Sequence, residues 1–299
     1  MAPTSNNLAP ELQHRLEAVA QKRISHVQLV YGGYTPAQRL KLTFADSTTC
    51  FAKIGTTPGT VSALRQEYTV YESLSGPFMP RFLGWDDHPD SPILLLEDLS
   101  YAFWPPPWNS HRIEQVLDSL SLMWAASIPN MPHLPELTFI WNGWQQVAEN
   151  PAPFLSLGLA TEDWLEQVLP GFLAIDYKVV ANGRSLLHLD LRSDNICFSQ
   201  ERAILVDWNL VCVGNSSVDL GFWLPSLEAE GGPPPETLLP NAGEIAGLVS
   251  GFFAARAGLP NIPDAPRVRY IQLVQLKTAL SWAVRTLGLP PLDGLSDTA

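Results

Sequence analysis

The stretch that decides the fold is residues 187–198, Leu-His-Leu-Asp-Leu-Arg-Ser-Asp-Asn-Ile-Cys-Phe, together with residues 203–208, Ala-Ile-Leu-Val-Asp-Trp. Short apolar runs of this kind, separated by polar and turn-forming residues, are typical of buried strands. Asp190 lies just beyond the first apolar run, and Asp207 lies at the end of the last one. The pattern therefore predicts short strands on either side of a polar loop, with a carboxylate at or just beyond each of two strand ends.

The order of the polar residues suits phosphoryl transfer. That reaction needs a carboxylate that accepts and orients a substrate hydroxyl, and oxygen ligands for the Mg²⁺ that bridges the nucleotide phosphates. Asp190 fits the first role, and Asn195 and Asp207 fit the second. Asn195 follows Asp190 by five residues, as in the His-Arg-Asp-Leu-x-x-x-Asn pattern of kinase catalytic loops. His188 precedes Asp190 by two residues, as the histidine of that pattern does. A polar hairpin whose Asp and Asn serve turn chemistry is the alternative, but the complete set favours a kinase-like site.

These residues resemble the aminoglycoside phosphotransferase family, whose members carry a comparable His-x-Asp loop and a downstream Asp. Val218-Asp219-Leu220 matches the Asp that follows the family's metal-binding strand. The resemblance spans most of the chain and is most specific over residues 188–219. Two positions depart from the pattern: Leu189 stands where the family often has Gly, and Trp208-Asn209 follow the metal-binding Asp where protein kinases have Phe-Gly.

A glycine pair in the N-terminal part is predicted to cover the nucleotide. Residues 27–31 and 40–44 alternate as strands do, and Gly32-Gly33 lie in the turn between them. Glycine lets backbone N–H groups approach a phosphate closely. An ordinary hairpin turn is the alternative, because the complete Gly-x-Gly-x-x-Gly pattern is absent.

Lys53 is unusual among the apolar residues of a third predicted strand, 50–54. A lysine there pairs with the α- and β-phosphates when a glutamate on the next helix holds it. A helix predicted over 62–73 offers Glu67, with Glu72 as a second candidate. A surface lysine beside an unrelated glutamate is the alternative.

Glu97-Asp98-Leu99 is predicted as the hinge that follows a hairpin of residues 81–85 and 93–97. An adenine ring at a hinge bonds with backbone groups, so Glu97 and Leu99 are assigned to the nucleotide site by position. Leu99 and Ile204 are suited to sandwich the base, and equally to a plain core. The predicted domains are a nucleotide-binding lobe, 1–99, and a catalytic and substrate-binding lobe, 100–299.

The order of the elements predicts an α+β, bilobal, protein-kinase-like fold: a small N-terminal lobe with an antiparallel sheet and a larger, mainly helical C-terminal lobe. Helical spacing predicts C-terminal-lobe helices over 111–126, 242–257 and 266–287. A helix capped by Thr161 is expected to reach Val168, with Pro170-Gly171 interrupting or ending it.

Composition limits the class of protein. With 299 residues, 46% hydrophobic and 16% charged, the chain is long enough for two folded lobes and is not disordered. The net charge of −12 argues against a nucleic-acid partner and suits a cationic substrate. No run of about 20 apolar residues predicts a membrane helix, and no signal-peptide pattern opens the chain, so we predict a cytoplasmic protein. Three cysteines without metal-like spacing predict buried free thiols.

The sequence thus predicts ATP-dependent phosphorylation of a hydroxyl on a small molecule, with ATP and Mg²⁺ as cofactors. Arg192 is expected to stabilise the transferring phosphoryl group, and His188 to fix the loop through hydrogen bonds. Only eleven residues separate Asp207 from Asp219, too few for the activation segment of a protein kinase.

The resemblance implies an aminoglycoside-like acceptor, and Glu228 and Glu230 are candidates to bind its amines, with a solvated helix end as the alternative for these two acids. Asp219 is expected to have a structural role. A kinase of a sugar or amino-alcohol, or a nucleotide-binding regulator without turnover, remain the alternatives. The oligomeric state is not predicted.

Overall fold

The computed structural model describes residues 8–33, 35–200, 202–263 and 265–294, and these divide into two compact units. The first unit comprises the described residues up to 104 together with 114–122 and 194–209. The second comprises 105–113, 123–193 and the described residues from 210 onward. The proposed separation of function between residues 1–99 and 100–299 stays a prediction.

A five-stranded antiparallel sheet with the order β1-β2-β3-β5-β4 forms the centre of the first unit. Its strands are β1 (Ile24–Leu29), β2 (Gln38–Phe44), β3 (Thr49–Ile54), β4 (Phe82–Asp86) and β5 (Ile93–Glu97). In β2 buried and half-buried side chains alternate, because successive residues of a strand point to opposite faces, whereas every residue of β5 is buried.

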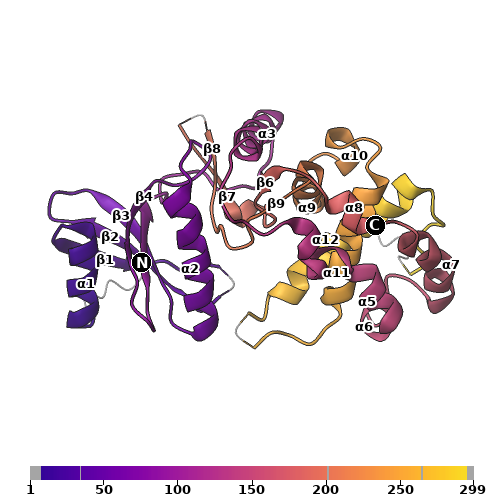
Figure 1. Ribbon diagram of the computed structural model, residues 1–299, viewed down its shortest axis with the longest axis horizontal. Coiled ribbons are helices and arrows are strands. Elements are labelled where there is room, and N and C mark those ends of the chain that lie inside the picture. Colours follow the sequence, from indigo (N-terminus) through magenta and orange to yellow (C-terminus); the bar gives the residue numbers. More distant parts are fainter. Residues whose placement is uncertain (1–7, 34, 201, 264, 295–299) are drawn as a thin grey trace. The chain divides into compact units, whose positions relative to one another are not determined.

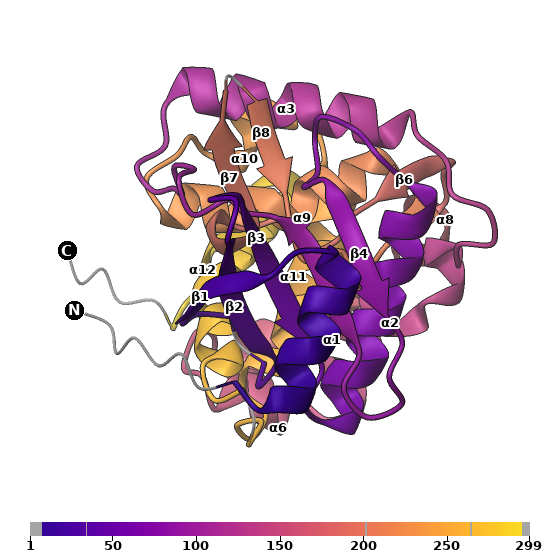
Figure 2. The same ribbon diagram turned by 90° about the vertical axis from the view of Figure 1, so that its left-hand side faces the viewer.

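Two helices cover opposite faces of this sheet (Figure 1; Figure 2 views α1 in front of the strands). Helix α1 (Pro10–Ala20) inserts Leu16 into the core formed by alternate residues of β2 and β3, among them Leu42 and Ala52. Helix α2 (Pro58–Ser73) lies on the other face. Because successive strand residues point to opposite faces, Lys53 faces α2 while its neighbours Ala52 and Ile54 face α1.

Helix α2 begins at Pro58, earlier than the predicted start at Ser62. Thr57 is its N-cap, and the Thr57 Oγ1 accepts a hydrogen bond from the Thr60 N–H, while Pro58 supplies the backbone angle suited to the first helical turn.

The hairpin of β7 (Ile196–Ser199) and β8 (Arg202–Leu205) completes the first unit. Ile204 and Cys197 of this hairpin form a small buried cluster with Leu99. The central part of helix α3 (Ser110–Trp124) also belongs here, and its Ser119 hydroxyl donates to the Ala203 carbonyl of β8 at 2.8 Å.

Helices dominate the second unit, and α11 lies at its centre, in contact with α12, α5, α9, α4 and α6 (Figure 1). A pair of short antiparallel strands, β6 (Ser185–Leu187) and β9 (Cys212–Gly214), precedes and follows the β7–β8 hairpin in the chain. The helical elements of this unit are η1 (Leu134–Glu136), α4 (Thr138–Trp141), α5 (Gly143–Glu149), α6 (Ala152–Leu155), α7 (Glu162–Leu173), α8 (Tyr177–Ala181), α9 (Ser216–Ala229), α10 (Pro235–Leu238), α11 (Gly243–Ala257) and α12 (Val268–Leu287), and a short turn η2 (Ser193–Asn195) follows β6.

Two helices differ from the sequence interpretation. Helix α7 has the predicted Thr161 cap, with the Trp164 N–H donating to its hydroxyl, but it continues through Pro170 to Leu173. Burial of Phe172 on this last turn offsets the backbone hydrogen bond that proline cannot make. Helix α9, which carries Asp219, was predicted only at its C-terminal end, through the alternative interpretation of Glu228 and Glu230 as a helix end.

All three cysteines are buried free thiols, as predicted: Cys50 in β3, Cys197 in β7 and Cys212 in β9. Burial raises the pKa of each thiol to about 12. Among the helices of the described ranges, none has the length and apolar character needed to cross a bilayer.

Candidate active site

Lys53 lies between two carboxylates. Its Nζ donates to Glu67 Oε2 of α2 at 2.6 Å and to Asp207 Oδ1, which follows β8, also at 2.6 Å. The structure therefore brings together the lysine and the helix glutamate that the sequence pattern paired, and adds Asp207, the predicted metal ligand, to them. Glu72, the second candidate, instead accepts a hydrogen bond from the Tyr68 hydroxyl.

Burial and charge act in opposite directions on this trio. Burial lowers the pKa of Lys53, but the charges of Asp207 and Glu67 outweigh it and hold that pKa above its ordinary value. Burial raises the pKa of Glu67, and the lysine charge opposes this effect. The result is a protonated lysine whose ammonium group is held in one position by two carboxylates. Such a group can bind an anion with little further loss of conformational freedom.

Asn195 and Asp207 lie at the same end of the β7–β8 hairpin. Ile196 pairs with Leu205, and the Val206 N–H donates to the Asn195 carbonyl at 2.9 Å, so the register continues to the two polar residues. Asp207 has a φ of 69°, in the left-handed region that non-glycine residues seldom adopt. Such a conformation is found where a side chain must be directed to one place.

Asn209 is a polar neighbour that the sequence interpretation noted only as a departure from the kinase pattern. Its Nδ2 donates to Asp207 Oδ1 at 2.5 Å, and its Oδ1 is buried with no protein donor within the described structure. The reverse amide orientation would direct an oxygen at a carboxylate, so the hydrogen bond fixes the assignment.

The predicted catalytic loop begins in the second unit, after β6, where Asp219 of α9 holds it. Asp219 Oδ1 accepts hydrogen bonds from the backbone N–H groups of His188 at 3.1 Å and Leu189 at 2.8 Å, and Oδ2 accepts one from Trp124 Nε1 at 3.0 Å. Burial raises the pKa of Asp219 to about 6, and these three hydrogen bonds oppose the rise. This is the backbone-tying role expected for Asp219.

Leu189 shows why the family often has glycine at this position. Its φ is 59°, again left-handed, and its side chain is only 5% exposed. Here the left-handed backbone, which leucine seldom adopts, is accompanied by a buried side chain.

Asp190 and Arg192 form an ion pair within the loop, with Arg192 Nη1 donating to Asp190 Oδ1. The buried His188 ring accepts the Asp190 N–H at its Nδ1, 3.3 Å away, so His188 fixes the backbone at Asp190, the predicted catalytic carboxylate. The sequence interpretation directed Arg192 to the phosphoryl group and did not foresee its contact with Asp190.

The hinge residues have packing partners of their own in the first unit. Glu97 accepts hydrogen bonds from the Arg81 N–H, the Tyr101 hydroxyl and the Arg202 guanidinium. Burial favours a higher pKa for Glu97, but these donors and the arginine charges lower it below its ordinary value. The Glu97 side chain thus ties β5 to the β7–β8 hairpin, and only its backbone remains for the predicted contact with a base.

The glycine turn follows β1. Gly32 and Gly33 have φ values of 135° and 74°, and a Cβ at Gly33 would lie 2.6 Å from the Arg39 guanidinium. Both positions therefore require glycine. Tyr34 of the same turn lies outside the described residues.

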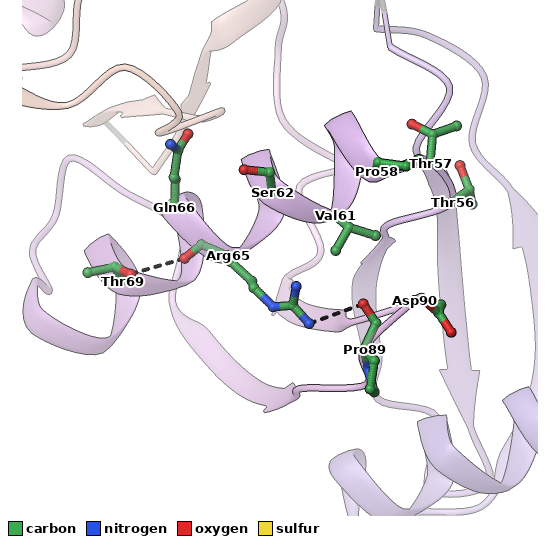
Figure 3. Close-up of a pocket in the computed structure, with 10 residues that line it drawn as sticks. All are labelled: Thr56, Thr57, Pro58, Val61, Ser62, Arg65, Gln66, Thr69, Pro89 and Asp90. Carbon is green, nitrogen blue, oxygen red and sulfur yellow. Dashed lines mark hydrogen bonds between the residues drawn. The ribbon is translucent and has the colours of Figure 1, made fainter.

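A surface pocket of about 620 Å³ lies elsewhere on the first unit, between the outer side of α2 and residues 89–90 (Figure 3). Its lining includes Thr57, Arg65 and Gln66, and Arg65 donates to the Pro89 carbonyl at 3.2 Å. None of the predicted site residues lines it.

Comparison with known proteins identifies the class. A phosphotransferase enzyme family profile matches residues 103–256, which is more than half of the chain, and the chain belongs to this family. It is accordingly a small-molecule kinase, and the family resemblance and the α+β kinase-like fold inferred from sequence are confirmed.

Solved structures agree on the fold. A spectinomycin phosphotransferase, solved with ADP and spectinomycin, has a TM-score of 0.64 at 13% identity, with 95% of this chain and 100% of that chain covered. The macrolide 2′-phosphotransferase MphH from Brachybacterium faecium, solved as the apoenzyme, has a TM-score of 0.53 at 15% identity, covering 94% of this chain and 99% of that chain. No curated protein matches the chain.

Proposed function

We propose that this kinase transfers the γ-phosphoryl group of ATP to a hydroxyl of a small, amine-bearing molecule. The observation that carries the proposal is the buried Lys53, held between Glu67 and Asp207 at 2.6 Å each. Lys53 and Glu67 are buried, and a buried ion pair is costly to desolvate and does not by itself stabilise a fold, so a functional reason for it is needed. Phosphate binding supplies that reason, because the lysine presents a fixed cation to a polyanion.

In this proposal Lys53 pairs with the nucleotide phosphates, and Glu67 keeps it in place. Gly32 and Gly33 allow the β1–β2 turn to approach the phosphates with its backbone N–H groups. The backbone at Glu97 and Leu99 would meet the adenine ring, and the side chains of Leu99 and Ile204, which form a buried cluster with Cys197, would sandwich the base.

Asn195 and Asp207 would hold Mg²⁺, and their fit can be judged from the donor set. Mg²⁺ prefers hard oxygen ligands and is usually held by one or two protein side chains plus phosphate and water. A carboxylate and an amide at one hairpin end match this preference, and the buried Asn209 Oδ1 is placed to accept a hydrogen bond from a bound water. Bound Mg²⁺ neutralises charge that develops on the phosphates during transfer.

Asp190 orients the acceptor hydroxyl and takes its proton as the hydroxyl oxygen bonds to the γ-phosphorus. The bond between that phosphorus and the oxygen bridging to the β-phosphate breaks, and ADP leaves. Arg192 would move from Asp190 to the transferring phosphoryl group, where a guanidinium can donate two parallel hydrogen bonds. His188 keeps the loop backbone in place throughout.

An aminoglycoside-like antibiotic is the acceptor we favour. Two observations support it. The net charge of −12 attracts a polycationic substrate. The fold is shared with a spectinomycin phosphotransferase and a macrolide 2′-phosphotransferase. A sugar or an amino-alcohol is the second choice of acceptor, and a cytoplasmic location, where ATP is available, belongs to the same proposal.

A coupled ADP-release assay with ATP and Mg²⁺ tests the proposal over a panel of aminoglycosides, sugars and amino-alcohols. Acceptor-dependent release that disappears in Asp190→Asn is the expected result, with affinity for the Mg-nucleotide unchanged within a few-fold. Near-normal turnover by Asp190→Asn would overturn the assignment of the base.

A matched variant separates the metal role from the base role. Asp207→Ala is expected to weaken Mg²⁺-dependent nucleotide binding in calorimetry, because it removes a metal ligand and a partner of Lys53. Unchanged binding would remove Asp207 from the metal site. Intact nucleotide binding without any acceptor-dependent release would favour a regulator over an enzyme of this panel.

A further inference from the structure

The C-terminal end of α9 carries an acidic residue, Glu230, where helices favour a basic residue such as lysine or arginine. Glu230 follows the last helical residue, Ala229, and its N–H donates to the Ser226 carbonyl at 3.1 Å. Helix C-termini carry partial negative charge, so a carboxylate there is electrostatically unfavourable. A residue that violates a local rule in this way indicates another demand on its side chain.

Both oxygens of the Glu230 carboxylate accept hydrogen bonds in the second unit. Trp108 Nε1 donates to Oε2 at 2.7 Å, and the Ser193 hydroxyl donates to Oε1 at 2.5 Å. Trp108 is itself packed edge-on against Trp223 of α9, with ring centroids 5.6 Å apart. The carboxylate is therefore fixed on one side by an anchored indole, and on the other it holds a serine.

That serine lies in the predicted catalytic loop. Ser193 follows Arg192 directly and is three residues beyond Asp190. The first residues of the same loop are held from the other end of α9, where Asp219 accepts the N–H groups of His188 and Leu189. One helix thus grips residues 188–193 at both ends, with Asp190 and Arg192 between the two attachments.

We propose that Glu230 is a positioning residue for phosphoryl transfer, which sets the geometry of Asp190 and Arg192 by holding Ser193, rather than a ligand for a substrate amine. The inference rests on the proposed function of Asp190. Charge-assisted hydrogen bonds to a carboxylate are short and strongly oriented, which suits a brace. A small displacement of a catalytic group reduces turnover without a comparable loss of binding.

Steady-state kinetics distinguish the two roles. Glu230→Gln and Ser193→Ala are each expected to lower kcat about 10- to 100-fold, as misplacement of a catalytic group does, with the KM for acceptor and for ATP changed less than about threefold. The double variant should be no slower than the slower single variant, because both changes break one contact. Ser193→Thr retains the hydroxyl and is expected to keep most of the activity. A rise in acceptor KM with kcat retained in Glu230→Gln would overturn the proposal in favour of amine binding.

Hydrogen exchange tests the brace without reference to turnover. In Glu230→Gln and Ser193→Ala, amides of residues 188–193 should exchange faster than in the wild-type protein. Glu149→Gln is the matched control, since Glu149 is an exposed acid at the C-terminal end of α5. In this variant the amides of residues 188–193 should exchange at the wild-type rate. Unchanged exchange in Glu230→Gln would refute the brace, whatever the acceptor assay shows. If wild-type protein lacks acceptor-dependent release while the exchange effect is present, the proposed function fails and the brace stands.

Discussion

Replacing Leu189 with glycine and, separately, with alanine tests whether the proposed catalytic loop stores backbone strain. Leu189 has a φ of 59° and is 5% exposed. Removing its side chain should lower the free energy of unfolding by about 2–5 kcal/mol in either variant, as for other buried leucines. The informative quantity is the difference between the two variants, in which the loss of packing largely cancels.

A left-handed conformation costs a non-glycine residue about 1–2 kcal/mol. Alanine keeps this cost and glycine removes it, but glycine adds about 0.5–1 kcal/mol through the greater freedom of its unfolded chain. Leu189→Gly should therefore be more stable than Leu189→Ala, by about 0.5–1 kcal/mol after the two terms are combined.

Leu191 provides the control, because it is fully buried two residues away and is not among the described residues with positive φ. There glycine should be less stable than alanine by about 0.5–1 kcal/mol. Urea unfolding followed by both fluorescence and circular dichroism measures all four variants, with coincident transitions required before free energies are compared. The reasoning is refuted if glycine is the less stable substitution at both positions.

Three further outcomes are expected. Lys53→Met leaves the Glu67 carboxylate buried without its cation, so the unfolding free energy should fall by about 3–5 kcal/mol, and adding Glu67→Leu should restore much of it in urea titrations. Burial raises the pKa of Asp219 to about 6, so its stabilising contribution is complete below about pH 4 and is lost as the pH rises through 6. Wild-type unfolding midpoints should accordingly fall more steeply between pH 4 and 7 than those of Asp219→Asn, and equal slopes would contradict the assigned pKa direction. Thr57→Ala removes the cap of α2 and should cost about 1 kcal/mol, measured by thermal unfolding, whereas no change would mean that the Thr60 side chain alone serves the helix start.

The pairing of Lys53 with Glu67 could be predicted because it depends on local periods. A strand directs alternate residues to one face, and a helix repeats its buried stripe every three or four residues, so strand, loop and helix together limit the glutamates within reach. The order of residues from His188 to Asp207 was equally accessible, because these roles occur at fixed spacing along one stretch of chain.

Most of helix α9 was missed because the usual signal is absent from it. Residues 218–227 are all buried, so the helix is apolar around its whole circumference and shows no amphipathic period. Gly221 and Pro225 resemble helix breakers, yet a Cβ at Gly221 would lie 2.5 Å from Ile245 Cγ2, so glycine is required there by the close approach of α11.

The hydrogen bonds of Glu230 could not be predicted from local pattern. Ser193 and Trp108 are distant from Glu230 in sequence, and no spacing rule relates them. Arg192 illustrates the same limit at short range: its position in the loop suited a phosphate contact, while the structure pairs it with Asp190. Contacts between residues that are far apart in the sequence can be identified only when the three-dimensional arrangement of the helices is known.

The rates at which the three buried thiols react with an alkylating reagent can report on local opening of the protein. Cys50, Cys197 and Cys212 lie in three different pairs of strands, and burial holds each thiol protonated and out of reach of reagents. Only the exposed thiolate reacts, so each labelling rate measures how often one strand pair opens. Peptide mapping after timed alkylation would rank the opening of the β3 sheet, the β7–β8 hairpin and the β6–β9 pair without any engineered probe. Nucleotide should slow labelling at Cys197 first, since that thiol adjoins Leu99 in the cluster proposed for the base.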